Sequence, residues 1–158
     1  MRLQQFLIAG LVLLLDQASK AVVVERFTAA TAIAVIPGFF RLVLVENTGM
    51  AFGLLDDSPS ALVFAVLTLV SAAILGFIIY LIWTNQFPSA LGGYGLAVIL
   101  GGAAGNVADR LVRGKVIDFL DFYVGSTHWP SFNVADSAIV VGAALLMMDL
   151  MRGREEIP

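Results

Sequence analysis

The chain has 158 residues, of which 59% are hydrophobic and 13% charged. That is about half the charged fraction of an average soluble domain, so an ordinary soluble protein is excluded and an integral membrane protein is indicated. The length suits one domain over 1–158, and a net charge of −3 without a basic block argues against nucleic acid as a partner. Because the chain has no cysteine, disulfides, thiolate catalysis and cysteine-based metal sites are excluded. The single histidine leaves little room for a histidine-rich metal site, whereas a carboxylate metal site stays open.

Four segments are apolar and long enough to cross a bilayer as helices, which requires about 20 residues. The first contains charged residues, and its apolar run after Arg2 also fits a signal peptide. No small-residue cleavage pattern follows, so a retained span is favoured. Glycines in the third segment would let neighbouring helices approach closely. The predicted spans are 5–24, 61–83, 91–112 and 133–151, and their even number places both termini on one side.

Two long connections share the other side. Residues 25–60 contain two strand-like stretches, 31–36 and 39–46, separated by Pro37-Gly38, which predict a small sheet or hairpin on the membrane surface. Residues 113–132 form the second long connection and contain Gly125, Trp129 and Pro130. With the candidate site residues Lys20 and Arg110 set aside, the basic residues number four on one side and three on the other, so they do not decide the orientation.

Ionisable residues within spans are candidates for function. Asp16 and Lys20 are four residues apart, so they share a helix face, either as a structural ion pair or as a pair that orients something in a cleft. In "ENTGMAFG", Asn47 offers a donor and an acceptor, and Gly49 allows close backbone approach. That stretch is either a simple turn or a loop that positions a substrate.

Two further groups lie at span ends. In "GNVADR", Arg110 could clamp a carboxylate or a phosphate with Asp109 as its partner, or the two could be a charged span end at the headgroups. Asn133 can cap the fourth helix and so fix the direction of Asp136. An aspartate in that first turn also complements the helix dipole, which alone would explain Asp136.

Hydrolysis by this chain would have to use carboxylates. The only histidine, His128, has no serine elbow of the G-x-S-x-G type, and no thiol is present. Two carboxylates brought together share one proton, so the ionised member can activate water while the protonated member polarises a carbonyl. Asp118 and Asp136 are candidates for such a pair, although Asp16, Asp109 and Asp121 are also available.

Five motifs in order, "DQASK", "ENTGMAFG", "GNVADR", "VIDFLDF" and "FNVADS", resemble those of the lipoprotein signal peptidases, or signal peptidase II. These are aspartic proteases of the bacterial cytoplasmic membrane, and the resemblance covers nearly the whole chain. It implies a membrane α-helical fold, a four-helix bundle with a small β cradle at about 25–60 and a short extracytoplasmic loop or helix. The implied activity removes the signal peptide from diacylglyceryl-modified prolipoproteins before the lipidated cysteine, without a metal or organic cofactor.

The resemblance also implies roles for individual residues. The catalytic pair would be Asp118 and Asp136, with Asp121 a neighbour outside the pattern. The resemblance places both termini in the cytoplasm and the site near the outer leaflet of the inner membrane. Expected partners are prolipoproteins, membrane lipids and globomycin-type cyclic peptide inhibitors, and the expected state is a monomer. The positions that would shape the site and hold the substrate are Asp16, Lys20, Asn47, Gly49, Asn106, Asp109, Arg110 and Asn133.

Two other classes of function remain open from the residues alone. A small proton- or ion-coupled transporter could use Asp16, Lys20, Asp109 and Asp136 as a relay. The lack of ionisable residues in the second span argues against it. A lipid-binding assembly or chaperone subunit would perform no chemistry.

Overall fold

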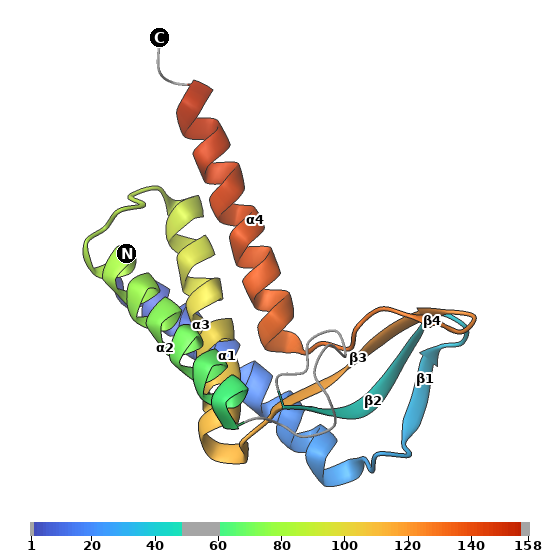
Figure 1. Ribbon diagram of the computed structural model, residues 1–158. Helices are drawn as coiled ribbons and strands as arrows, with labels where there is room; N and C mark the ends of the chain where they lie inside the picture. Colours follow the sequence, from blue (N-terminus) through green and yellow to red (C-terminus); the bar gives the residue numbers. More distant parts are fainter. Residues whose placement is uncertain (1, 49–60, 156–158) are drawn as a thin grey trace.

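The computed structural model describes residues 2–48 and 61–155. Its helices are α1 (Arg2–Arg26), α2 (Ala61–Trp83), α3 (Ala90–Arg113) and α4 (Val134–Glu155) (Figure 1). All four are long and apolar enough to cross a membrane, which confirms the prediction of four such helices. Three of them are longer than predicted: α1 begins at Arg2, α3 gains one residue at each end, and α4 continues to Glu155.

Helix α3 lies at the centre of the bundle. The protein buries 67% of the most apolar stretch of α3 but only 6% of that of α2. Glycine permits this packing, as the sequence predicted: a Cβ atom at Gly101 would lie 2.5 Å from the carbonyl oxygen of Ala9 on α1. A Cβ atom at Gly105 would lie 3.3 Å from the Cβ atom of Ala135 on α4. The backbones of α1 and α4 therefore pack directly against α3.

The two ends of α3 are capped by local sequence. The Ser89 side chain accepts a hydrogen bond of 2.9 Å from the Gly92 N–H at the first turn. At the other end Gly114 adopts φ 69°, and its N–H donates to the Arg110 carbonyl oxygen at 3.1 Å. Glycine adopts this left-handed conformation without strain, so the chain turns at once into the next strand. That turn brings Asp118 close to the end of α3.

The strands form one antiparallel sheet in the order β1 (Ala32–Ile36), β2 (Phe40–Asn47), β3 (Val116–Val124) and β4 (Thr127–His128). The hairpin β1–β2 confirms the strands predicted on either side of Pro37-Gly38. The second long connection, 113–132, supplies β3 and β4, two strands that the sequence did not indicate. Strand β3 occupies the edge of β2 that β1 leaves open, and so satisfies its backbone hydrogen bonds. The rest of the expected cradle, 49–60, lies outside the described residues.

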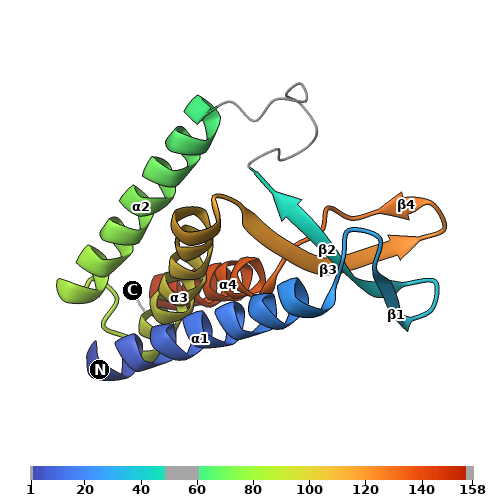
Figure 2. The same cartoon turned by 90° about the horizontal axis from the view of Figure 1, so that it is seen from below.

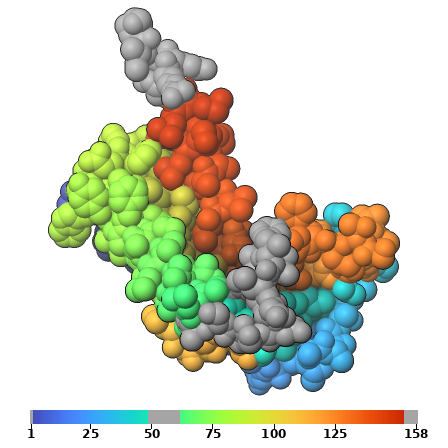
Figure 3. Space-filling model, in the orientation of Figure 1, coloured from blue at the N-terminus to red at the C-terminus, as the bar shows by residue number. Residues whose placement is uncertain are grey.

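The sheet is attached to the end of the bundle away from the termini and projects to one side (Figures 2 and 3). Val23 near the end of α1 packs with Ile117 and Phe119 of β3 in a buried apolar cluster. A second cluster, which includes Ile82 and Leu96, joins α2 to α3 further along the spans. The first cluster fixes the sheet against α1, so side chains from the strands can meet those from the helix ends.

Candidate active site

The predicted polar positions converge where the sheet meets the helices. They come from α1, the end of β2, the second half of α3, the start of β3 and the first turn of α4. The predicted Gly49 lies outside the described residues. The positions brought together are Asp16, Lys20, Asn47, Asn106, Asp109, Arg110, Asp118, Asn133 and Asp136.

Two asparagines connect Asp118 to Asp136. The Asn133 Nδ2 atom donates to Asp118 Oδ1 at 2.7 Å and to Asn106 Oδ1 at 3.3 Å. The Asn106 Nδ2 atom in turn donates to Asp136 Oδ1 at 2.7 Å. Asn47, at the end of β2, donates to the other oxygen of Asp118 at 3.0 Å. The two carboxylates therefore belong to one hydrogen-bonded cluster, although 18 positions separate them in the sequence.

The start of α4 fixes the position of Asp136. The Asp136 N–H donates to Asn133 Oδ1 at 2.9 Å, and the Asn133 N–H donates to Asp136 Oδ2 at 3.2 Å. This is the reciprocal arrangement of a capping box. The predicted Asn133 cap is confirmed, and Asp136 is part of the helix cap as well as of the cluster. Asn133 and Asp136 together thus cap the start of α4 and orient the Asp136 carboxylate toward Asn106.

Asp118 is only 2% exposed, and its electrostatic surroundings are asymmetric. Burial raises the pKa of Asp118 above the ordinary aspartate value. The negative charge of Asp136 raises it further, whereas the hydrogen bonds from Asn47 and Asn133 and the charge of Lys20 oppose the rise. The balance leaves the pKa raised, so Asp118 holds a proton more readily than an exposed aspartate does.

A buried ion network supports the cluster from within the bundle. Lys20 is completely buried, and its Nζ lies 2.9 Å from Asp16 Oδ2 and 2.7 Å from Asp109 Oδ2. The predicted pairing of Asp16 with Lys20 on one face of α1 is confirmed. The other oxygen of Asp16 accepts a 2.9 Å bond from the Ala135 N–H. This contact holds the first turn of α4 against α1.

The ion network is linked directly to the two candidate carboxylates. The Lys20 Nζ atom donates to Asn106 Oδ1 at 3.1 Å. Because that oxygen is held by a cation, the amide nitrogen of Asn106 is the atom presented to Asp136. Lys20 and Asn133, which both donate to Oδ1, therefore set which way the Asn106 amide faces.

Sequence reasoning missed two members of this network. Gln17 donates from Nε2 to Asp109 Oδ1 at 3.2 Å and to the Gly105 carbonyl oxygen at 3.1 Å. Arg113 binds Asp109 Oδ1 and donates to Gln17 Oε1. The i,i+4 spacing of Asp109 and Arg113 was the available signal. Asp109 was expected to pair with Arg110, but it pairs with Lys20 and Arg113 instead, because residues four apart share a helix face whereas adjacent residues do not.

Arg110 is half-buried at the rim of the cluster. Its Nη1 atom donates to the Asn106 carbonyl oxygen at 3.3 Å on the same helix. Asp136, Asp109 and Asp118 are its electrostatic partners. A guanidinium in this position balances the charge of the two carboxylates, and within residues 2–48 and 61–155 it forms no direct ion pair with either of them.

Asp121 lies apart from the cluster. It pairs with Arg41 at 2.5 Å, and His128 Nδ1 lies 3.0 Å from its Oδ1 atom. Burial raises the pKa of Asp121, but the hydrogen bonds and charges of His128 and Arg41 outweigh that effect and leave it lowered. The structure thus gives Asp118 and Asp121, three residues apart, opposite electrostatic environments. Among the described residues, no group of three or more histidine, aspartate or glutamate side chains is arranged to hold a metal ion.

These features define a class: a four-span membrane protein whose paired carboxylates are embedded in a hydrogen-bonded cluster at one end of the bundle. A family model described as "Signal peptidase (SPase) II" matches residues 8–152. The chain belongs to the signal peptidase II family, which confirms the resemblance seen in its motifs.

Individual relatives agree with this assignment. A "Lipoprotein signal peptidase" of Solibacter usitatus (strain Ellin6076) is 44% identical, over 99% of this chain and 95% of the relative. One from Syntrophus aciditrophicus (strain SB) is 43% identical, over 94% and 92%. A solved structure described as "Bacterial membrane enzyme structure by the in meso method at 2.3 A resolution" aligns with a TM-score of 0.84 at 26% identity, over 98% of this chain and 92% of that one.

Proposed function

We propose that this protein is an aspartic endopeptidase that removes the signal peptide from diacylglyceryl-modified prolipoproteins, cleaving before the lipidated cysteine. The observation that carries the proposal is the hydrogen-bonded path from Asp118 through Asn133 and Asn106 to Asp136. Membership of the signal peptidase II family supports the reaction class. Asp118 and Asp136 would be the catalytic residues, and the other members of the cluster would position them and the substrate.

The charges of the cluster favour one shared proton. Its cations are Lys20, Arg110 and Arg113, and its carboxylates are Asp16, Asp109, Asp118 and Asp136. Four carboxylates against three cations leave one excess negative charge in a medium of low dielectric, and a single proton removes it. Because its pKa is raised, Asp118 is the proposed proton holder.

The proposed reaction uses both states of the dyad. Asp136 takes a proton from a water molecule as the water oxygen attacks the scissile carbonyl carbon, while Asp118 donates its proton to the carbonyl oxygen. The C–N bond then breaks as the proton held by Asp136 passes to the leaving nitrogen. Asp118 recovers its proton from the hydroxyl of the intermediate as the new carboxyl forms. Protons and bonds balance with water as the only co-reactant, so no cofactor is required.

The position of the site in the fold suits a lipid-anchored substrate. The cluster lies at the end of the spans that joins the sheet, away from both termini. On our proposal, the termini are cytoplasmic and the site faces the outer leaflet of the inner membrane. The acyl chains of the substrate then stay in the bilayer beside the spans while the peptide reaches the carboxylates. Globomycin-type cyclic peptides would compete for this position, and one chain would suffice as a monomeric, single-domain enzyme.

The buried ionisable residues do not support the alternative of a proton relay. Such a relay needs groups along the whole length of the spans. Among the described residues, the buried charged side chains all lie in the sheet-proximal part of the protein, namely Asp16, Lys20, Asp109, Asp118 and Asp121. The other alternative, a lipid-binding subunit that performs no chemistry, predicts no cleavage of the precursor in the assay that follows.

The test is cleavage of a purified diacylglyceryl-modified precursor by Asp118→Asn and Asp136→Asn variants. Each change keeps the size of the side chain but removes a group that can exchange a proton, so we expect cleavage to fall at least about 10³-fold. Asp149→Asn is the matched control, because Asp149 shares α4 with Asp136 but binds Ser89 at the other end of the helix. It should cleave normally. A near-normal rate for either dyad variant, with circular dichroism like that of the wild type, would show that the assignment is wrong.

A further inference from the structure

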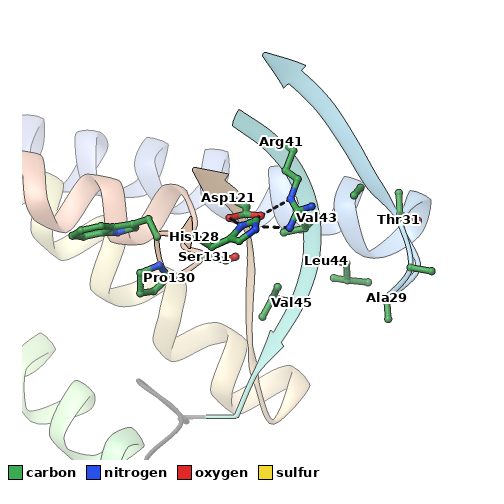
Figure 4. A pocket seen from close by; sticks show the side chains of 13 residues that line it. Ala29, Thr31, Arg41, Val43, Leu44, Val45, Asp121, His128, Pro130 and Ser131 are labelled. Carbon is green, nitrogen blue, oxygen red and sulfur yellow. Dashed lines mark hydrogen bonds and ion pairs between the residues drawn. The ribbon is translucent and has the colours of Figure 1, made fainter. Parts of the chain in front are cut away.

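A cavity of about 560 Å³ lies against the sheet, outside the carboxylate cluster (Figure 4). One wall is the link from α1 into β1, residues 29–32, and the other is residues 128–131 after β3. Strand β2 contributes residues 43–45 between them. Arg41 and Asp121, joined by their ion pair, complete the lining. We refer to this space as the cradle cavity.

The cradle cavity lies along an open edge of β2. Strand β1 pairs with β2 only from Phe40 to Val43, where Ala32 is the partner of Val43. Beyond that pair, the part of the chain that the structure describes places no strand beside Leu44, Val45 or Glu46 on the side away from β3. An open strand edge is a template for an added strand. The cavity thus occupies the space that a continuation of β1 would fill.

This open edge leads directly to the proposed catalytic residues. Val45 lines the cavity and is the register partner of Asp118 on β3. Two residues further along β2, Asn47 donates a hydrogen bond to Asp118. An extended chain advances about 3.3 Å per residue. A peptide that leaves the dyad along β2 therefore enters the cavity within about three residues.

The lining of the cavity indicates a polar peptide. Thr31 and Ser131 provide hydroxyl groups, while alanines in 29–32 leave room for a main chain. Asp121 is almost fully enclosed by Arg41 and His128, whereas the Arg41 side chain is 34% exposed. The accessible charge is therefore positive, which suits neutral polar or acidic residues better than basic ones. An apolar signal sequence would instead remain in the bilayer.

We propose that the segment of the prolipoprotein just after the cleavage site, at the start of the mature lipoprotein, adds to the open edge of β2 as a strand and fills the cradle cavity. This inference rests on the proposed function, because it takes the cleavage reaction for granted and adds where the mature side of the substrate binds. Main-chain hydrogen bonds to those groups of residues 44–46 that face the open edge provide affinity for many different sequences. The positive charge of Arg41 at one end of the cavity favours sequences with neutral polar or acidic residues over those with basic residues.

The first experiment compares two synthetic diacylglyceryl precursors that differ only after the lipidated cysteine. The short precursor ends one residue after the cysteine, and the long one continues for about four residues more, enough to pass the open edge of β2 at residues 44–46 at the extended rise. The wild-type enzyme should have a KM about tenfold lower for the long precursor, as two net main-chain hydrogen bonds would give. Equal KM values overturn the inference. Failure to cleave either precursor contradicts the proposed function itself, and the inference with it.

Neighbouring residues of β1 offer a matched pair of variants. Ala32 lines the cavity, whereas the next residue, Ile33, does not, and both are exposed. Successive side chains of a strand point to opposite faces, so Ala32→Trp fills the cavity and Ile33→Trp does not. We expect Ala32→Trp to raise the KM of the long precursor to that of the short one and to leave the short one unchanged. Ile33→Trp should leave both KM values unchanged. Equal effects of the two variants contradict the inference.

A scan of the long precursor with single N-methyl groups tests the strand directly, using the wild-type enzyme. In an added strand, alternate N–H groups face the neighbouring edge. N-methylation after the cysteine should therefore raise the KM about fivefold or more at every second residue and have little effect between them. A uniform effect, or none, excludes strand addition.

Discussion

Replacing Lys20 by methionine tests the role of the buried ion network most directly. The Lys20 ammonium is the cation that joins Asp16 to Asp109, at 2.9 and 2.7 Å, and it is fully buried. Methionine fills a similar volume but leaves the carboxylates with only Gln17, Arg113 and main-chain N–H donors. Removing one partner of a buried ion pair costs about 3–5 kcal/mol. For a chain of this size that corresponds to a fall in Tm of roughly 6–20 °C.

The measurement is thermal unfolding in detergent followed by circular dichroism. Adding Asp109→Asn to the Lys20→Met variant removes the uncompensated charge, so the double variant should recover part of the lost stability. Activity should not recover with it, because Asn106 has still lost the cation that orients its amide. A Tm within about 2 °C of the wild type for Lys20→Met, less than 1 kcal/mol on this scale, would refute the reasoning.

Two further predictions concern the dyad and the helix packing. The value of kcat/KM should fall as the pH rises through the raised pKa of Asp118, because the dyad then loses its shared proton. In the Asn47→Ala variant this fall should occur at higher pH, because the lost hydrogen bond from Asn47 lowers the pKa of Asp118 in the wild type. An unchanged limb in the pH–rate profile would argue against Asp118 as the proton holder. Gly105→Ala would place a Cβ atom 3.0 Å from the Asp16 carboxyl carbon, so it should destabilise the protein by about 1–3 kcal/mol. Gly76→Ala on α2, where a Cβ atom meets nothing within 4 Å, is the control and should be neutral or slightly stabilising; equal Tm changes for the two would contradict this account.

Local patterns in the sequence were enough to predict the elements. The four spans follow from hydropathy and length, and the hairpin follows from two β-rich stretches around Pro37-Gly38. The Asp16–Lys20 pair and the Asn133 cap were also predictable, because their partners lie within one helical turn. Strand β3 was not recognised, because "VIDFLDFYV" is bonded to β2 some 70 positions earlier in the chain, and nothing local indicates that partner.

The contacts between elements could not be derived from spacing alone. Lys20 meets Asp109 across 89 positions of sequence, and Gln17 meets Gly105 across 88. Residue types left Asp118 and Asp136 as one carboxylate pair among several, and only the family motifs singled them out. What the geometry adds is the pair of asparagines that connects them, since Asn106 and Asn133 come from different helices. Their convergence depends on the close packing of α1 and α4 on α3.

The contrast between α2 and α3 sets different rules for sequence change in the two helices. Most of α2 lies at the surface of the bundle, so side chains there, unlike Ile78 and Ile82 packed on α3, can be exchanged for others of similar hydropathy at little cost. In α3, glycines at 101 and 105 admit no additional atom, so even a conservative apolar replacement there is a change of fit. Within this family, amino-acid substitutions in α2 should therefore be frequent but remain apolar, whereas substitutions in α3 should be rare and limited by side-chain volume.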